Sequence, residues 1–263
     1  MNWDGTTKPP APLELDPDHP VNKDCFLFLP MEEGVGGRIK DLVNPGIGDI
    51  QKAGIAPLNH TWGVTPDRGR AWNTYAQKNA AANNISLGAD LTDYDMSYGG
   101  GVDKPCTIMY ISRLNSVAAS DVIDKWVSGS AQEFYAGWDA SGRPRIRFFH
   151  FDNSARIGKK RNSAFSTGQS VMNVWTYDGS GAEAGIKGYE DNAVMSVASE
   201  SSGSYTGMTN TTAPITFASR SNGVVTGDCR IYQVRLWHRE LSFREVNELF
   251  HKPWMGCRPV GMK

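Results

Sequence analysis

The chain has 263 residues, a formal net charge of −1 and 40% hydrophobic residues, which suits one large β domain or two small ones. No apolar run approaches the roughly 18 to 20 residues of a membrane-spanning helix, and the N-terminal segment lacks a basic start followed by an apolar core. We therefore expect neither a transmembrane helix nor a Sec signal peptide. The pI near 6.5 argues against a duplex nucleic-acid-binding protein.

Residues 1–20 are rich in Pro and Asp and have no hydrophobic periodicity, which predicts an extended N-terminal arm before one domain over 21–263. The apolar run CFLFLPM at 25–31 is too short for a helix and is typical of a buried strand. Further runs rich in β-branched and aromatic residues alternate with turn signals, at 106–114, 133–138, 143–151, 170–178, 192–198, 213–220 and 230–237. Apart from the tail, only 119–127 has a helical pattern. The whole predicts an all-β sandwich.

The tail, RIYQVRLW followed by HRELSFREVNELFHKPW, predicts one strand and one short helix. Alternation over 230–237 indicates a half-buried strand, with the buried positions Tyr232, Val234 and Leu236. Ser242 and Glu245 stand at the spacing of a capping box, in which each side chain binds a backbone N–H of the other. An apolar stripe over 246–250 follows, and Pro253 prevents the helix from continuing. We expect this helix to fold back on the sandwich.

The four cysteines are far apart and form no CxxC pair: Cys25, Cys106, Cys229 and Cys257. This spacing argues against a zinc site and predicts free, buried thiols. Whether Cys25 and Cys229 form a disulfide stays open, because pairing of the first and last strands would bring them close.

The tail resembles the closing segment of concanavalin A-like lectin/glucanase jelly rolls of the laminin-G-like group. That segment has an apolar–Trp pair and then R-x-L-S-x-x-E, matched here by Leu236-Trp237 and by 239–245. The start of the domain is similar, because Glu33-Gly34-Val35-Gly36 matches the group's EG-x-G loop. The segment WTYDGSG at 175–181 resembles its DG hairpin. The resemblance implies a concanavalin A-like jelly-roll β-sandwich with a short C-terminal helix. Tyr232 replaces the acidic residue that many members have in the last strand, so no calcium or carboxylate role is assigned there.

The layout also resembles proteins of tailed bacteriophages: a Trp- and Pro-containing arm, a jelly roll, and an ending on Pro253-Trp254. This implies a virion component made in the host cytoplasm, either a capsid decoration or a tail or fibre protein. Its partners would be other virion subunits, second copies of the chain, or a glycan, with no membrane and no nucleic acid.

The sequence lacks the catalytic patterns of the enzymes that share this fold. A glycosidase needs two carboxylates about 5 to 10 Å apart, and the glucanase pattern E-x-D-x-x-E is missing, as are G-x-S-x-G and HExxH. We therefore expect a non-catalytic binding or structural module. The alternative is a polysaccharide-degrading hydrolase or lyase that uses Glu133 and Asp139.

An Asp-rich stretch over 88–105 is a candidate calcium loop, with Asp90, Asp93, Asp95 and Asp103 as ligands. Calcium needs several oxygen ligands at about 2.3 to 2.6 Å. The spacing is not that of a loop ending in a bidentate Glu, so an Asp-rich turn that bonds its own backbone is the alternative.

A candidate glycan site lies on the hairpin that turns at 139–142. If this four-residue loop sets the register, one sheet face has an aromatic and arginine ladder made of Phe134, Trp138, Arg143, Arg145 and Arg147. The core face would then carry Tyr135, Ile146 and Phe148. Guanidinium groups bind carboxylate or sulfate in a bidentate fashion and stack on rings. The alternatives are a charged edge that prevents aggregation and a protein interface.

Two further features accompany this ladder. Residues 143–161 contain seven basic residues and one acidic residue, whereas residues 1–50 contain nine acidic and four basic ones. A basic face that meets an anionic partner and two ordinary solvated stretches are both compatible with this asymmetry. A second aromatic set lies in the loop-rich stretch 56–101, where the candidate ligand-binding residues are Trp72, Tyr75, Tyr94 and Tyr98.

Overall fold

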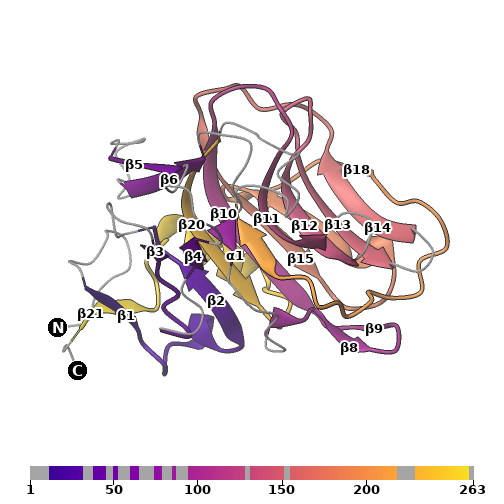
Figure 1. Ribbon diagram of the computed structural model, residues 1–263, viewed down its shortest axis with the longest axis horizontal. Helices are drawn as coiled ribbons and strands as arrows, with labels where there is room; N and C mark the ends of the chain where they lie inside the picture. Colours follow the sequence, from indigo (N-terminus) through magenta and orange to yellow (C-terminus); the bar gives the residue numbers. More distant parts are fainter. Residues whose placement is uncertain are drawn as a thin grey trace.

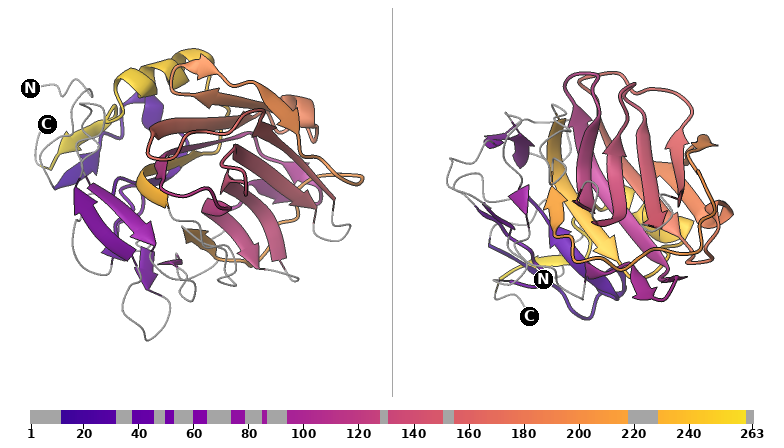
Figure 2. Two further views of the ribbon diagram at one scale, coloured as in Figure 1. Left: turned by 90° about the horizontal axis from the view of Figure 1, so that it is seen from above. Right: turned by 45° about the vertical axis from the view of Figure 1, so that its right-hand side comes forward.

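A computed structural model of the chain describes residues 12–31, 38–45, 50–52, 60–64, 74–78, 85–86, 94–127, 131–150, 155–217 and 229–260, with backbone only for the short strands between 50 and 86. Two antiparallel sheets are stacked as layers, as Figures 1 and 2 show. The chain is therefore an all-β sandwich, as predicted.

The first layer, sheet 1, is built around the last long strand of the chain. In spatial order it contains β17 (Ala193–Val194), β16 (Ile186–Glu190), β15 (Ser170–Tyr177), β10 (Cys106–Leu114), β20 (Cys229–Trp237), β6 (Thr74–Lys78) and β5 (His60–Val64), and β2 (Cys25–Leu29) also pairs with β20. Strand β20 therefore lies beside β10 and β2 in the middle of the sheet, although it is formed from the end of the chain.

The second layer, sheet 2, carries the hairpin of the predicted ladder. In spatial order it contains β18 (Val197–Ser199), β14 (Ala155–Arg161), β13 (Pro144–His150), β12 (Ala131–Trp138), β11 (Ser120–Val127), β19 (Ile215–Phe217), β7 (Ile85–Ser86), β4 (Ile50–Lys52) and β3 (Arg38–Ile39). Two small sheets complete the described strands: β1 (Leu13–Leu15) with β21 (Cys257–Pro259), and β8 (Ser97–Gly99) with β9 (Val102–Asp103). Among the described residues, the helices with stated bounds are η1 (Pro20–Asn22), η4 (Glu183–Gly185) and α1 (Phe243–His251).

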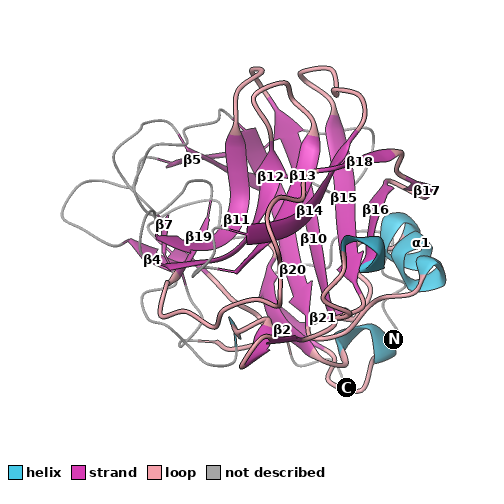
Figure 3. Cartoon of the chain, turned by 90° about the vertical axis from the view of Figure 1, so that its right-hand side faces the viewer, coloured by secondary structure: helices cyan, strands magenta, loops and turns pink. Residues whose placement is uncertain are grey.

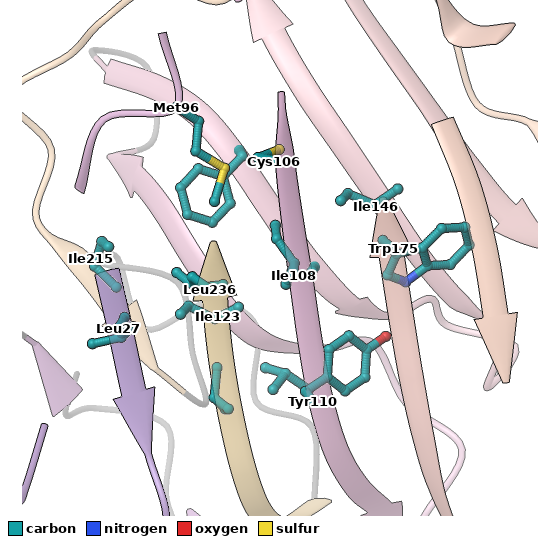
Figure 4. Packing of buried hydrophobic residues seen from close by; sticks show 14 of the residues in the cluster. Leu27, Met96, Cys106, Ile108, Tyr110, Ile123, Ile146, Trp175, Ile215 and Leu236 are labelled. Atoms are coloured by element: carbon teal, nitrogen blue, oxygen red, sulfur yellow. The ribbon is translucent and has the colours of Figure 1, made fainter. Parts of the chain in front are cut away.

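The core lies between the two sheets (Figure 4). Ile108, Trp175 and Leu236 come from sheet 1 and meet side chains of sheet 2, among them Ile123 and Ile146, all of them at most 1% exposed. Alternate residues of a strand point to the same face, so the apolar positions of each strand reach this core together. Removing this apolar surface from water is the main favourable contribution to folding.

The outer face of sheet 1 is covered by α1, which lies beside β15 and β16 (Figure 3). Its apolar stripe packs on the residues of sheet 1 that point away from the core, among them Met109, Ile111, Met172 and Val174. Ser242 caps the helix as predicted, because its Oγ accepts from the Glu245 N–H while the Glu245 carboxylate accepts from the Ser242 N–H.

Burial on both faces corrects the expectation that β20 is half-buried. Gln233 and Arg235 point away from the core, yet both are fully buried, because the segment after α1 lies over them. Gln233 Nε2 donates to the Pro253 carbonyl oxygen at 3.2 Å. The guanidinium of Arg235 donates to the carbonyl oxygens of Pro253 at 2.9 Å and Met255 at 3.0 Å, and stacks 3.7 Å above the Phe28 ring.

Two further expectations are corrected. Residues 119–127 were expected to be helical, but 120–127 form strand β11, because pairing with β12 and β19 on either side satisfies its backbone. The extended arm expected over 1–20 does not reach residue 20: β1 pairs with β21, η1 follows, and Leu13 is 1% exposed. Residues 1–11 lie outside the described residues.

The cysteines agree with the expectation of reduced thiols, because none of the four forms a disulfide. Cys25 pairs with Trp237 at one end of β20, whereas Cys229 lies at the other end, opposite Leu114. Pairing of the first and last strands therefore holds these two cysteines at opposite ends of the sheet. In the part of the chain that the structure describes, no helix has the length and apolarity needed to cross a membrane.

We predict that replacing Ser242 by Ala lowers the free energy of unfolding by about 1 kcal/mol, because the Glu245 N–H in the first helical turn loses its partner, the Ser242 Oγ. Urea denaturation measures this change. Ser204→Ala, an exposed serine outside any helix, is the control and should change the free energy little. Equal stability of the two variants would contradict the capping role.

Candidate functional site

The β12–β13 hairpin is closed by Asp139 and Arg143, which differs by one residue from the predicted turn. The Asp139 N–H donates to the Arg143 carbonyl oxygen at 2.9 Å, and the Asp139 carboxylate accepts from the N–H groups of Ser141 and Arg143 at 2.8 and 3.0 Å. Three residues therefore form the loop, and Gly142 has the positive φ of +73° that such a turn needs. Trp138 consequently pairs with Pro144 instead of Arg143.

This shift of one residue changes which side chains of β12 lie on the same sheet face as the arginines of β13. Phe134 and Trp138 are fully buried and face the core, together with Ile146 and Phe148, so the expectation that they form a ligand platform is wrong. Arg145 pairs with Gly137 and Arg147 with Tyr135 on the outer face. Tyr135 therefore belongs to the arginine face and not to the core between the sheets. Arg143 forms an ion pair with Asp139 at 2.7 Å within the turn.

Three aromatic rings lie against the outer face of sheet 2, one on β11, one on β12 and one on β13. Trp126 and Phe149 meet edge to face at 4.6 Å between ring centroids, and Tyr135 lies 5.6 Å from Phe149 and 5.7 Å from Trp126. All three are at most 9% exposed. This aromatic cluster is therefore a support beneath other side chains and not an open surface.

Cations lie above the aromatic cluster. The guanidinium carbons of Arg145 and Arg147 lie 4.8 and 5.4 Å from the centroid of Tyr135. A cation over an aromatic face is attracted by the negative centre of the ring. Gly158 on β14 gives Arg147 its place, since a Cβ there would lie 2.8 Å from Arg147 Cγ.

The neighbouring strand adds two more cations around one carboxylate. Arg147 Nε donates to Glu200 Oε2 at 2.7 Å, and Lys160 Nζ lies 3.2 Å from Glu200 Oε1. Arg156 Nε donates to the Glu200 carbonyl oxygen at 3.1 Å. Burial by itself would raise the pKa of Glu200, but the hydrogen bond and charge of Arg147 lower it below its ordinary value. Glu200 is therefore ionised at neutral pH and holds these cations in place.

The cationic face, which we define as Arg145, Arg147, Arg156 and Lys160, carries more positive charge than the carboxylates of the described residues balance. Glu200 is shared between Arg147 and Lys160, and Asp121 lies 4.0 Å from Arg145. Arg147 uses only Nε for Glu200, and its terminal nitrogens make no hydrogen bond to the described residues. Such an arrangement can accept a carboxylate or sulfate from outside.

The predicted calcium site is replaced, as far as it is described, by an ion-pair network. Asp95 binds the ammonium of Lys125, which is 1% exposed, and Asp95 Oδ2 accepts from Asn210 at 2.7 Å. Lys125 Nζ also lies 2.8 Å from Glu133 Oε2. The buried ammonium of Lys125 supplies the positive charge here, so the Asp95 carboxylate binds Lys125 and Asn210 and not a calcium ion. Asp90 and Asp93 lie outside the described residues.

Asp103 is held by hydroxyl groups. Its Oδ2 accepts from Tyr177 Oη at 2.5 Å and from Tyr205 Oη at 2.8 Å, and its Oδ1 accepts from the Met208 N–H at 2.5 Å. Burial and the Asp103 charge raise the pKa of both tyrosines, which keeps them protonated as donors. Within the described ranges, no group of three or more His, Cys, Asp or Glu side chains is placed to hold a metal ion.

The two carboxylates of the enzyme alternative both have structural partners. Glu133 is fully buried and accepts from the Met96 N–H at 2.9 Å besides its ion pair with Lys125. Desolvation raises the pKa of Glu133, and the charge of Lys125 opposes this rise. Asp139 serves its own hairpin, and although burial would raise its pKa, the hydrogen bond from Arg143 lowers it. Both carboxylates are therefore engaged by partners from the same chain.

The two members of the second aromatic set whose side chains are described, Tyr94 and Tyr98, differ in environment. Tyr94 is 1% exposed, packs beside Phe26 and donates its hydroxyl to Asp41 Oδ2 at 3.2 Å, so it is a core residue. Tyr98 lies on β8 and is 69% exposed. Tyr75 lies on β6, where only the backbone is described, and Trp72 lies outside the described residues.

Several members of the cationic face and its support were not predicted: Trp126, Tyr135, Phe149, Arg156, Lys160 and Glu200. The basic run at 156–161 was visible in the sequence, and its alternation on β14 places Arg156 and Lys160 on the same face as Arg147. No sequence pattern indicated Glu200, because its contact with Arg147 joins residues 53 positions apart in the chain.

Comparisons with known proteins agree with this fold. No protein-family model and no curated protein matches the sequence. The binding domain of Paraclostridial Mosquitocidal Protein 1 matches with a TM-score of 0.62 and 15% identity, over 88% of this chain and 52% of that one. The receptor binding domain of a botulinum neurotoxin C/D mosaic serotype matches with a TM-score of 0.60 and 13% identity, over 87% of this chain and 51% of that one.

A Trypanosoma rangeli sialidase in complex with sialic acid matches with a TM-score of 0.57 and 14% identity, over 88% of this chain and 33% of that one. The chain thus spans about half the length of the two toxin domains and about a third of the sialidase. At these identities the likeness concerns the fold alone, and it agrees with the predicted jelly-roll β-sandwich.

We predict that Lys125→Met lowers the free energy of unfolding by about 3 to 5 kcal/mol at pH 7, because Glu133 and Asp95 lose their shared cation. Without Lys125 the raised pKa of Glu133 rises further, so the folded state binds a proton more tightly than the unfolded state does. The loss should therefore shrink as the pH falls through that raised pKa.

Urea denaturation between pH 4 and 8 measures this effect. Lys187→Met is the matched control, since Lys187 forms a surface ion pair with Glu240 at 2.8 Å and its side chain is 54% exposed. The control should lose less than about 1 kcal/mol. A Lys125→Met variant as stable as this control would contradict the account of the buried network.

Proposed function

We propose that the chain is a non-catalytic binding module that takes anionic glycans on the cationic face of sheet 2. The observation that carries this proposal is the set of four cations on one sheet face: Arg145 and Arg147 lie over Tyr135, and Arg156 and Lys160 bind Glu200 beside them. Arg147 is fixed through Nε, and its terminal nitrogens make no hydrogen bond to the described residues. A fixed guanidinium loses little side-chain freedom when it binds a carboxylate or sulfate group.

The structural neighbours support a binding role without assigning a ligand. Two of them are binding domains of toxins, and one is a sialidase whose bound ligand is sialic acid, a sugar acid. The partners proposed here are therefore acidic polysaccharides or glycans that end in a sugar acid. Electrostatic attraction to such ligands decreases as salt rises, because exposed charges are screened.

The finer proposal places the module in a bacteriophage virion, as a capsid decoration or a tail or fibre protein. The sequence layout supports it, with a proline-containing segment at residues 1–11 before the first described strand. That segment would bind other virion subunits or a second copy of the chain. Light scattering of the full chain and of a variant without residues 1–11 tests assembly. Monomers in both samples at high concentration, with no association with capsid protein, would contradict this setting.

We predict that the protein is retarded in native gels that contain acidic polysaccharides such as alginate or chondroitin sulfate, and not in gels with dextran. Arg147→Ala should raise the apparent dissociation constant at least about tenfold, equivalent to about 1.4 kcal/mol. Arg147→Lys should recover part of this loss, since it keeps the charge but not the planar fork.

The control is Arg244→Ala, which removes an arginine of α1 whose side chain is 88% exposed. Its retardation should equal that of the unchanged protein. Equal retardation of Arg147→Ala and Arg244→Ala would contradict the assigned face. New reducing or unsaturated ends in the same samples would instead establish the alternative, a polysaccharide-degrading enzyme.

A further inference from the structure

A cavity lies where β14 ends and the β16–β17 turn begins, on the other side of β14 from the cationic face. Its volume of 430 Å³ lies within the range of ligand pockets, about 300 to 1,000 Å³. One wall is the segment 164–169, and the other is the turn at 190–193. Neither wall has a role in the proposed function.

Arg161 fixes both walls of this cavity. Its guanidinium forms a two-bond ion pair with Glu190, in which the second bond, from a terminal nitrogen to Oε1, is 2.9 Å long. The other terminal nitrogen donates to the carbonyl oxygens of Ser163 at 2.8 Å and Ala164 at 3.2 Å. Such a fork holds a loop in one arrangement, so the cavity is formed before any ligand arrives.

The loop is also held at its base. The Phe165 N–H donates to the Gly142 carbonyl oxygen at 3.0 Å, and the Gly168 N–H donates to the Leu114 carbonyl oxygen at 2.8 Å. The Phe165 ring lies against Trp138 at 5.6 Å and beneath the Arg161 guanidinium at 4.2 Å. The cavity therefore has a rigid wall with an apolar part.

Besides Ala164 and Ala193, the lining contains three uncharged polar side chains. Ser166, Gln169 and Asn192 line the cavity, and their side chains make no hydrogen bond to other described residues. Two amides and a hydroxyl offer donors and acceptors together, which suits a ligand whose hydroxyl groups are donors and acceptors as well. Charged lining groups comprise Arg161, Glu190 and Asp191, so an anion would meet more negative than positive charge.

We propose that this cavity is a second binding site, which takes an uncharged sugar ring through its hydroxyl groups. Gln169 and Asn192 supply hydrogen bonds from opposite walls, and Phe165 supports the apolar C–H face of the ring. The site differs in ligand class from the cationic face, and it does not depend on that face binding anything.

The test is an NMR titration of the ¹⁵N-labelled full chain with methyl glycosides of glucose, galactose, mannose and N-acetylglucosamine, and with sodium glucuronate for comparison. At least one neutral glycoside should shift the side-chain amide signals of Gln169 and Asn192 in a saturable way. Gln169→Ala and Asn192→Ala should each raise the dissociation constant about fivefold or more, which corresponds to loss of one or two net hydrogen bonds.

Ser166 and Thr167 give a matched pair of controls, because both are exposed neighbours with a hydroxyl group and only Ser166 lines the cavity. Ser166→Ala should weaken binding, and Thr167→Ala should leave it unchanged. The proposal is overturned if no neutral glycoside shifts these signals, if glucuronate alone does so, or if Gln169→Ala binds as before.

The outcome can be separated from that of the proposed function. Arg147→Ala should weaken acidic polysaccharide binding and leave the glycoside titration unchanged. Gln169→Ala should weaken glycoside binding and leave acidic polysaccharide binding unchanged. The amide spectrum of each variant reports whether it is folded, so a loss of binding is not confused with a loss of structure.

Discussion

The buried guanidinium of Arg235 connects a strand from near the start of the chain with the segment that follows the C-terminal helix. It lies on β20, stacks on Phe28 of β2 and binds carbonyl oxygens of the segment that follows α1. No carboxylate lies within ion-pair distance of it among the described residues, so carbonyl dipoles and an aromatic face compensate its desolvation. Burial lowers the pKa of this group. Sheet 1 and its covering helix thus form one unit only when the end of the chain is in place.

Much of the fold could be predicted because strands and helix caps have local signals. The runs at 106–114 and 170–178 became β10 and β15, and Ser242 caps α1 as its spacing indicated. The cationic face could be predicted only in part, because a strand has a period of two and one extra or missing loop residue exchanges its faces. Whether the Asp139 turn holds three or four residues is decided by backbone hydrogen bonds, and these are not visible in a sequence pattern.

The carboxylates show a second limit of sequence reasoning. Asp95, Asp103 and Glu133 have the residue types of metal or catalytic sites, yet all three are buried and hold distant segments together. The difference depends on their partners, a lysine ammonium and two tyrosine hydroxyls, which come from other strands and loops. Charge buried in this way is costly without its partner, so it favours one arrangement of the 94–104 segment over others.

Strands β1 and β21 place the two ends of the described chain side by side. Leu13 pairs with Pro259, and the Val260 N–H donates to the Pro12 carbonyl oxygen at 3.0 Å. A domain whose ends are adjacent can be inserted into a surface loop of another protein with little distortion of the host. For the same reason a short peptide can join these ends, and new ends can be opened at an exposed turn. The sandwich is thus a suitable cassette for grafting and for circular permutation.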